Sequence, residues 1–267
     1  MVRRGLAPTR RQAQEHIAAG RVTVAGAPAD KAARLVAPDE ALAVLGPPPR
    51  FVGRGGEKVD AALERFPIDV EGRDALDAGA STGGFTDALL QRGARRVVAV
   101  DVGHGQLDTR LRDDPRVEVH ERTNVRDLRG PDDVGGAVDL VTADLSFISL
   151  RTVLPALVTV ARPGADLILL VKPQFEAGRQ EAARGRGVIT DPVVWRRVLG
   201  EVKGAVIDHG AVIMGAMVSP LTGADGNVEF LLWARTAASG DAPRPIVDLD
   251  LDLDAVVDEA VARREDG

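Results

Sequence analysis

Cysteine is absent from this chain of 267 residues. Without thiols the protein has no disulfide framework, no cysteine-ligated zinc centre and no cysteine nucleophile. The histidines are few and dispersed along the sequence, so we expect no metal site. They are His16, His104, His120 and His209. The absence of disulfides makes the cytoplasm the expected compartment.

Long apolar runs are missing as well. No stretch approaches the roughly 20 apolar residues of a membrane-spanning helix, and no signal peptide opens the chain. We therefore expect no membrane partner. Hydrophobic residues still make up 45% of the sequence, which is ample for a core. A chain of this length is expected to hold one full α/β domain and a small additional module.

Positive charge shows no overall excess, because the formal net charge is −6. The charge is nevertheless unevenly distributed. Residues 1–58 contain 10 Lys and Arg against 5 Asp and Glu, whereas residues 237–267 contain 3 against 9. A basic front of this kind fits a surface that faces nucleic acid. A modest basic excess is also typical of an ordinary solvated surface, and both interpretations stay open.

Residues 75–85 predict a strand, a glycine turn and the start of a helix. The next strand, 97–100, leads into Asp101, which lies 22 residues after Gly79. That spacing is typical of a carboxylate that accepts the hydroxyls of a nucleoside ribose. The glycines at 79, 83 and 84 do not form G-x-G-x-x-G, and no Gly-Lys-Ser/Thr is present to hold a triphosphate. Such a loop suits a ligand with a carboxylate and a sulfonium, such as S-adenosylmethionine (SAM); the alternative is a turn that serves packing alone.

Further apolar runs at 138–141, 167–171, 212–217 and 228–233 alternate with predicted helices near 150–161 and 192–208. This alternation predicts a doubly wound, Rossmann-like α/β fold. One run leads into Asp144 and another ends at Lys172. Strand ends in open parallel sheets carry the chemistry of such folds. Each residue alone is weak evidence, because a strand-end lysine is usually solvated and an Asp-Leu-Ser turn is often a cap.

Seven segments carry the motifs of a known family. They are Arg54-Gly55-Gly56-Glu57-Lys58, Asp77 to Phe85, Asp101 to Leu107, Glu121 to Asn124, Ala143 to Ser149, Val171 to Glu176 and Gly226 to Phe230. With these segments the chain resembles the TlyA branch of the FtsJ-type SAM-dependent 2′-O-methyltransferases, which are often labelled haemolysins. The resemblance implies SAM as cofactor and ribosomal RNA or ribosomal subunits as partner. It also implies methylation of cytidine ribose in 16S and, in many members, 23S RNA.

Lys58, Asp144, Lys172 and Glu229 match the Lys-Asp-Lys-Glu catalytic tetrad of that family in order. A ribose hydroxyl is a poor nucleophile at neutral pH, so its attack on a methyl group benefits from a positioned base. Lys172 is the candidate base. Desolvation and the nearby cation of Lys58 favour its neutral amine, whereas the two carboxylates oppose it, and these acids could instead orient the lysines. The Asn-Pro-Pro-aromatic motif of amine methyltransferases does not stand at 144–147, which favours a hydroxyl acceptor.

The cofactor site expected from the strand–loop–helix unit and the resemblance has nine members. They are Asp77, Gly79, Ser81, Gly83, Gly84, Phe85, Asp101, Asn124 and Asp144. Four of the six phenylalanines fall in the motifs, at 85, 147, 175 and 230. Core packing is the ordinary interpretation of these rings. Phe147 and Phe175, beside the candidate catalytic residues, have the alternative of stacking on a splayed base.

A capping-box pattern at 9–12 opens a predicted helix through about residue 19, and a strand follows at 22–24. This helix–strand module resembles the RNA-binding domain first seen in ribosomal small-subunit protein four (S4-like). The expected phosphate contacts are Arg3, Arg4, Arg10, Arg11, Arg21 and Arg54. The basic half-helix that usually precedes this module is missing, so either the module is shortened or the start is misassigned.

We therefore expect four parts. They are a shortened S4-like RNA-binding domain at 1–46, a linker at 47–54, an FtsJ-like methyltransferase domain at 55–238 and an acidic, partly helical tail at 239–267 with its helix starting at Leu253. Residues 175–192 are expected to form a loop with Arg179, Arg184 and Arg186, which is either an RNA-contacting lid or a long connection.

Two other functions fit parts of this sequence less well. A non-catalytic RNA-binding module that retains a SAM fold is disfavoured by the complete Lys-Asp-Lys-Glu set. A membrane-lytic protein, which the haemolysin label suggests, is disfavoured because the sequence has neither a membrane-spanning segment nor a strongly basic amphipathic one. No protein partner is predicted.

Overall fold

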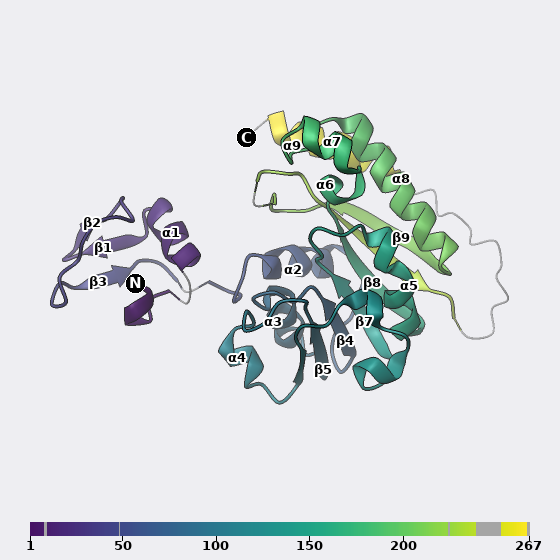
Figure 1. The fold of residues 1–267 in the computed structure, drawn as a ribbon, viewed down its shortest axis with the longest axis horizontal. Helices are drawn as coiled ribbons and strands as arrows, with labels where there is room; N and C mark the ends of the chain where they lie inside the picture. The colour runs from purple at the N-terminus through teal and green to yellow at the C-terminus, as the bar shows by residue number, and fades with distance from the viewer. Residues whose placement is uncertain (8–9, 48, 224, 239–251, 266–267) are drawn as a thin grey trace. The chain divides into compact units, whose positions relative to one another are not determined.

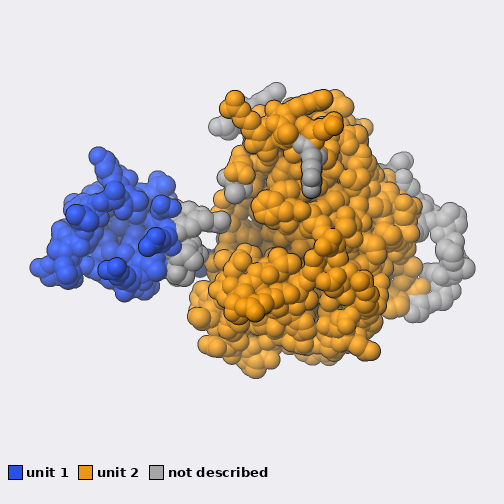
Figure 2. Space-filling view, viewed as in Figure 1, with its two compact units in different colours: residues 1–50 blue, residues 51–267 orange. Residues whose placement is uncertain are grey.

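The computed structural model describes residues 1–7, 10–47, 49–223, 225–238 and 252–265. The chain forms two compact units, residues 1–50 and residues 51–267 (Figure 2). Phe51 and Val52, which fall in the segment predicted as a linker, are buried in the core of the second unit. The division between the units therefore lies between Arg50 and Phe51.

The first unit is a helix followed by a small antiparallel sheet. It contains η1 (Val2–Arg4), α1 (Arg10–Ala18), β1 (Val22–Val24), β2 (Ala27–Pro28) and β3 (Leu42–Val44), with strand order β2-β1-β3. The predicted helix and strand are both present. The chain turns between them at Gly20, whose φ of 67° lies in the left-handed region that glycine adopts at little cost. Val22 and Val24 are buried and Thr23 is only partly so, which is the alternation of a half-buried strand.

A seven-stranded mixed sheet forms the centre of the second unit. Its strands are β4 (Asp74–Ala78), β5 (Arg96–Val100), β6 (Val117–His120), β7 (Val138–Ala143), β8 (Ala161–Val171), β9 (Ala211–Val218) and β10 (Phe230–Thr236), in the order β6-β5-β4-β7-β8-β10-β9. Strands β4 to β8 pair in parallel, which confirms the predicted doubly wound α/β fold. β10 runs antiparallel to β8 and β9, because a loop and not a crossover helix connects β9 to β10.

Helices cover both faces of this sheet (Figure 1). α2 (Gly55–Arg65) and α3 (Gly84–Gln91) pack on one face, and α5 (Leu150–Val160), α8 (Pro192–Asp208) and α9 (Leu253–Glu265) pack on the other. Each face of the sheet therefore has its own hydrophobic core, and alternate residues of β8 belong to one or the other. Leu167 and Leu169 pack with α5 and α8, whereas Ile168 and Leu170 pack with α2 and α3. Three shorter helices lie between β5 and β7 in the chain: α4 (Thr109–Arg112), η2 (Val125–Asp127) and η3 (Pro131–Val134).

The predictions for residues 175–192 and for the acidic tail have different outcomes. Residues 175–192 were expected to form a loop, but α6 (Pro173–Glu176) and α7 (Arg179–Arg184) occupy much of this segment. The prediction was wrong there because the run of Arg, Gln, Glu and Ala has high helix propensity although it is too short to show a period. The helix expected from Leu253 is present as α9, while residues 239–251 of the acidic tail lie outside the described residues.

Within the described ranges, no helix combines the length and the apolarity needed to cross a membrane.

Candidate active site

Lys172 and Asp144 meet at the carboxyl edge of the sheet, where β8 and β7 end side by side. Lys172 Nζ lies 2.5 Å from Asp144 Oδ1 and donates a hydrogen bond of 3.0 Å to Ser146 Oγ. The Asp144 N–H donates to the carbonyl of Ala78 on β4, which holds the loop after β7 against the neighbouring strand. The lysine is 8% exposed, so its amine lies in a largely desolvated position with two oxygen acceptors.

A second lysine–carboxylate pair joins α2 to the segment before β10. Lys58 Nζ lies 2.5 Å from Glu229 Oε2, and both side chains are buried. A side chain at Gly223 would come within 2.8 Å of Glu229 Oε1, so the Gly223 backbone packs directly on this acid. The four tetrad residues therefore form two compensated ion pairs, which is how a protein tolerates buried charge.

Close packing of α2 brings the second pair toward the first. A Cβ at Gly84 of α3 would lie 2.8 Å from the amide nitrogen of Gly56, so only glycine allows the two helices to approach this closely. A Cβ at Gly55, the first residue of α2, would lie 3.7 Å from Asp144 Oδ2. Lys58 follows one turn later. The start of α2 thus lies against Asp144, and the sequence-predicted tetrad is gathered in one region.

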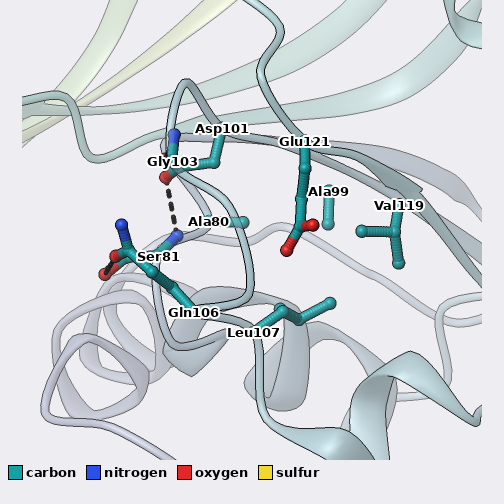
Figure 3. A pocket seen from close by; sticks show the side chains of 9 residues that line it. All are labelled: Ala80, Ser81, Ala99, Asp101, Gly103, Gln106, Leu107, Val119 and Glu121. Carbon is teal, nitrogen blue, oxygen red and sulfur yellow. Dashed lines mark hydrogen bonds between the residues drawn. The ribbon is translucent and has the colours of Figure 1, made fainter.

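A small pocket lies beside this region, at the ends of β4, β5 and β6 (Figure 3). The residues that line it are Ala80, Ser81, Ala99, Asp101, Gly103, Gln106, Leu107, Val119 and Glu121. The Asp101 carboxylate accepts hydrogen bonds from the amides of Ser81 at 2.8 Å and Gly103 at 2.6 Å. Of the predicted cofactor residues, Ser81 and Asp101 therefore line the pocket. Gln106 and Glu121 were not predicted as site residues, although both lie within the family motifs.

The remaining predicted cofactor residues shape this region in other ways. Gly79 has a φ of 89°, and a side chain there would come within 2.5 Å of the Asp144 carbonyl. At Gly83, with a φ of 96°, a Cβ would collide with Leu111 at 2.2 Å. The Phe85 ring is buried in the core shared with α2. Asn124 caps η2, because its Oδ1 accepts a hydrogen bond from the amide of Arg126.

Asp77 is a fully buried acid on β4. Its Oδ2 accepts hydrogen bonds from the Thr86 amide at 2.9 Å and hydroxyl at 2.6 Å, while its Oδ1 has no partner among the described residues. Burial raises the pKa of Asp77 to about 7; the bonds from Thr86 act in the opposite direction, and the negative charges of Asp144 and Asp101 add to the increase. The ionised form is therefore unfavourable in the folded protein.

This pKa predicts a stability effect for Asp77→Asn. The folded state keeps the proton up to about pH 7, whereas the unfolded chain releases it near the ordinary aspartate pKa of 3.8, so stability falls as pH rises between these values. From pH 5 to pH 8 we expect the wild type to lose on the order of 2–3 kcal/mol relative to the variant. Urea unfolding of both proteins across this range measures the difference. Parallel curves would show that Asp77 ionises normally.

The predicted phosphate contacts of the first unit differ in their surroundings. Arg3 and Arg10 are exposed. Arg4 donates to the carbonyls of Glu40 at 2.6 Å and Ala37 at 2.7 Å. The guanidinium of Arg21 donates to the carbonyls of Leu45 and Pro47. The side chain of Arg11 lies outside what the structure describes. Arg4 and Arg21 therefore contribute to the fold of this unit while their charge remains near its surface.

Arg54, the sixth predicted RNA contact, belongs to the second unit. It is the N-cap residue of α2, and its Nη2 donates to the carbonyl of Thr222 at 3.2 Å. This bond ties the start of α2 to Thr222, seven residues before Glu229. Arg54 is thus placed to support the Lys58–Glu229 pair from outside.

The four phenylalanines of the motifs differ in their surroundings, so the two interpretations of their rings apply to different residues. Phe230 and Phe85 are buried, as the core-packing interpretation requires. Phe147 is 91% exposed and has a φ of 65°, a conformation that is unfavourable for a bulky residue. Its ring lies 5.2 Å from that of Phe175, centroid to centroid. A strained, exposed ring three residues after Asp144 is a candidate contact for substrate.

Histidine and carboxylate side chains form no cluster that could hold a metal ion in the part of the chain that the structure describes. The polar chemistry at the sheet edge is that of two amines, two carboxylates and one hydroxyl. This set can accept and donate protons and can orient a hydroxyl group for attack.

Comparisons with known proteins match both units. The model of the FtsJ-like methyltransferase family matches residues 51–236, and that of the S4 domain matches residues 1–42. The chain is 54% identical over 237 residues to the 16S/23S rRNA (cytidine-2′-O)-methyltransferase TlyA of Mycobacterium tuberculosis, covering 88% of each protein. It is 45% identical to YqxC of Bacillus subtilis, a protein named for rRNA methyltransferase activity, covering 90% of the chain and 85% of the relative. A solved structure from Streptococcus thermophilus, named as a hemolysin, is 37% identical with a TM-score of 0.80 and covers 98% of this chain and 96% of its own.

Proposed function

This chain belongs to the FtsJ-like methyltransferases and to their TlyA branch, and from that membership we propose that it methylates the 2′-hydroxyl of cytidine in 16S and 23S ribosomal RNA. The observation that carries the proposal is the meeting of Lys172 with Asp144 and of Lys58 with Glu229 beside a pocket that contains Asp101. These residues occur in the order of the family tetrad. The M. tuberculosis relative carries the name of the same activity.

The pocket and its neighbouring turn fit SAM as the cofactor. Asp101 provides a carboxylate for ribose hydroxyls. The glycine turn at 79–84 packs so closely against Asp144 that a side chain at Gly79 would not fit. Asp77 Oδ1 is a buried carboxyl oxygen without a partner among the described residues, as expected where a polar ligand completes a site. When bound, SAM supplies an electrophilic methyl group on a positively charged sulfur.

Lys172 is positioned to take the proton of the ribose hydroxyl. A neutral amine has two N–H bonds and one lone pair, and Asp144 and Ser146 offer an acceptor to each N–H. The lone pair then points to the remaining direction, where a substrate hydroxyl can donate. With SAM bound, the methyl–sulfur bond would break as the ribose oxygen takes the methyl group, and the hydroxyl proton would move to Nζ and yield the ammonium, which Asp144 stabilises. Ser146 was not predicted to be a site residue and acts here by orienting the amine.

Lys58 and Glu229 have a supporting role in this proposal. Their ion pair is buried and joins α2 to the β10 side of the site. A compensated pair adds no net charge to the site, so Lys58 and Glu229 act by holding its geometry. Phe147 and Phe175 are proposed to stack on the target base after it leaves the RNA helix.

A direct assay tests the proposed function. Purified protein is incubated with tritiated SAM and with either isolated 30S or isolated 50S subunits, and 2′-O-methyl groups are mapped on the recovered RNA. Methylation of a cytidine ribose in both subunits is expected. Absence of transfer to either subunit, with SAM binding intact, would leave a non-catalytic RNA-binding protein instead.

Asp101→Ala is expected to weaken SAM binding by about 10- to 100-fold, the effect of losing hydrogen bonds to a charged group. The variant also loses the bonds that hold the amides of Ser81 and Gly103. RNA affinity should stay unchanged, because none of the residues that line the pocket is one of the arginines expected to contact RNA. Calorimetry with SAM and a filter-binding assay with rRNA give the two numbers. Glu118→Ala removes a nearby acid that does not line the pocket and is the matched control; unchanged SAM affinity of the Asp101 variant would refute the assignment.

A further inference from the structure

Glu176 is a buried acid four residues after Lys172, and its carboxylate reaches back to the start of α5. It is 3% exposed. Oε2 accepts a hydrogen bond from Ser149 Oγ at 2.5 Å, and Oε1 accepts one from the Leu150 amide at 2.6 Å. Arg151 Nε lies 3.3 Å from Oε2. Every one of these donors belongs to residues 149–151, so a single carboxylate clamps that segment.

The clamp joins the two segments that carry the candidate catalytic pair. Residues 144–149 leave the end of β7 and contain Asp144 and Ser146, while residues 172–176 leave the end of β8 and contain Lys172. Arg151 strengthens the connection, because its Nη2 donates to the Glu176 carbonyl at 2.8 Å and its Nη1 lies 2.7 Å from Glu201 of α8. The contacts that orient Lys172 therefore depend on a link between these two segments beyond the strands.

We propose that Glu176 is a positioning residue, which holds the Asp144–Ser146 loop at the distance from which both residues bind Lys172. This inference rests on the proposed function. The negative carboxylate at the first amides of α5 is stabilised by the exposed N–H groups of the helix start and by Arg151. Without this acid the loop is anchored mainly by the Asp144 amide bond to β4, and Ser146 moves relative to Nζ.

Asp166, in the middle of β8, offers a matched control. This acid is also buried, at 1% exposed, and accepts from Arg73 at 2.7 Å, the Trp233 indole at 2.8 Å and Arg235 at 2.9 Å. Its substitution removes a buried acid with as many donors, from β8 itself, whereas Glu176 is the last residue of α6. It lies six residues before Lys172, and its partners Arg73, Trp233 and Arg235 all lie outside the 144–149 and 172–176 segments.

The first measurement compares Glu176→Gln and Asp166→Asn in full-length protein, at a temperature where both are folded. Glu176→Gln is expected to slow single-turnover methyl transfer by about 10- to 100-fold, as a displacement of reacting groups does. SAM affinity and KM for rRNA should stay within a few-fold of wild type. Asp166→Asn should lower Tm at least as much and leave the single-turnover rate unchanged. If Glu176→Gln proves poorly folded, Ser149→Ala removes one contact of the same carboxylate and is expected to slow transfer less.

The second measurement places Glu176→Gln in the Lys172→Ala background. A positioning role predicts that the loss disappears there, because the residue acts only through Lys172. An equal loss in both backgrounds, or a wild-type rate for Glu176→Gln, would overturn the inference. Lys172→Ala alone reports on the proposed mechanism: if it keeps full activity, the base assignment fails, whatever Glu176→Gln does.

Discussion

Lys172→Ala is expected to lower single-turnover methyl transfer by roughly 10²–10⁴-fold, the range for loss of a general base. Affinities for SAM and rRNA should remain within a few-fold, because the pocket around Asp101 and the arginines of the first unit do not involve this side chain. Transfer from tritiated SAM under enzyme excess measures the chemical step. Lys203→Ala on α8 is the matched lysine control and should retain the wild-type rate.

Lys172→Arg separates a base from a fixed positive charge. A guanidinium keeps its proton across the working pH range, so it can pair with Asp144 but cannot accept the ribose proton. We expect this variant to be as slow as Lys172→Ala. A rate equal to wild type would mean that Lys172 acts by electrostatic attraction, and the proton would need another acceptor.

Removal of residues 1–46 is expected to lower rRNA methylation by at least about 100-fold at physiological salt, because we expect the basic residues of the first unit to contact RNA phosphates. This segment carries 7 Lys and Arg against 4 Asp and Glu. The remaining chain retains both cores of the second unit, including Phe51 and Val52, and should bind SAM normally. Calorimetry and methyl transfer to ribosomal subunits test the two statements.

A charge-reversal variant of the full chain controls for the loss of a whole unit. Arg3→Glu with Arg10→Glu changes two exposed side chains and leaves Arg4 and Arg21, which bond to backbone carbonyls, in place. Weaker rRNA binding with a shallower dependence on salt is expected. Full methylation of subunits by the truncated protein would contradict a role of this unit in RNA binding.

Local patterns in the sequence determined much of the fold. The glycine turn after β4, the polar residues at the ends of β7 and β8 and the helix–strand module near the start were all predicted, because each depends on residues close together in the chain. The order of the strands and the direction of β10 depend on which segments pair across the sheet. Apolar periodicity contains no information on that pairing, so the antiparallel β10 and the partly buried β6 appeared only in the structure.

The candidate site divides in the same way. The four tetrad residues were identified from motifs and order, but which lysine pairs with which acid was decided by the tertiary structure: Lys172 with Asp144, and Lys58 with Glu229. Burial has the same origin. Asp77 is desolvated, and its Oδ1 lacks a described partner, because α3 and the strands beside β4 enclose it. Glu176 bonds to the start of α5 because β7 and β8 are neighbours in the sheet. Desolvation and hydrogen bonds between residues 26 apart arise from packing, and no local pattern encodes them.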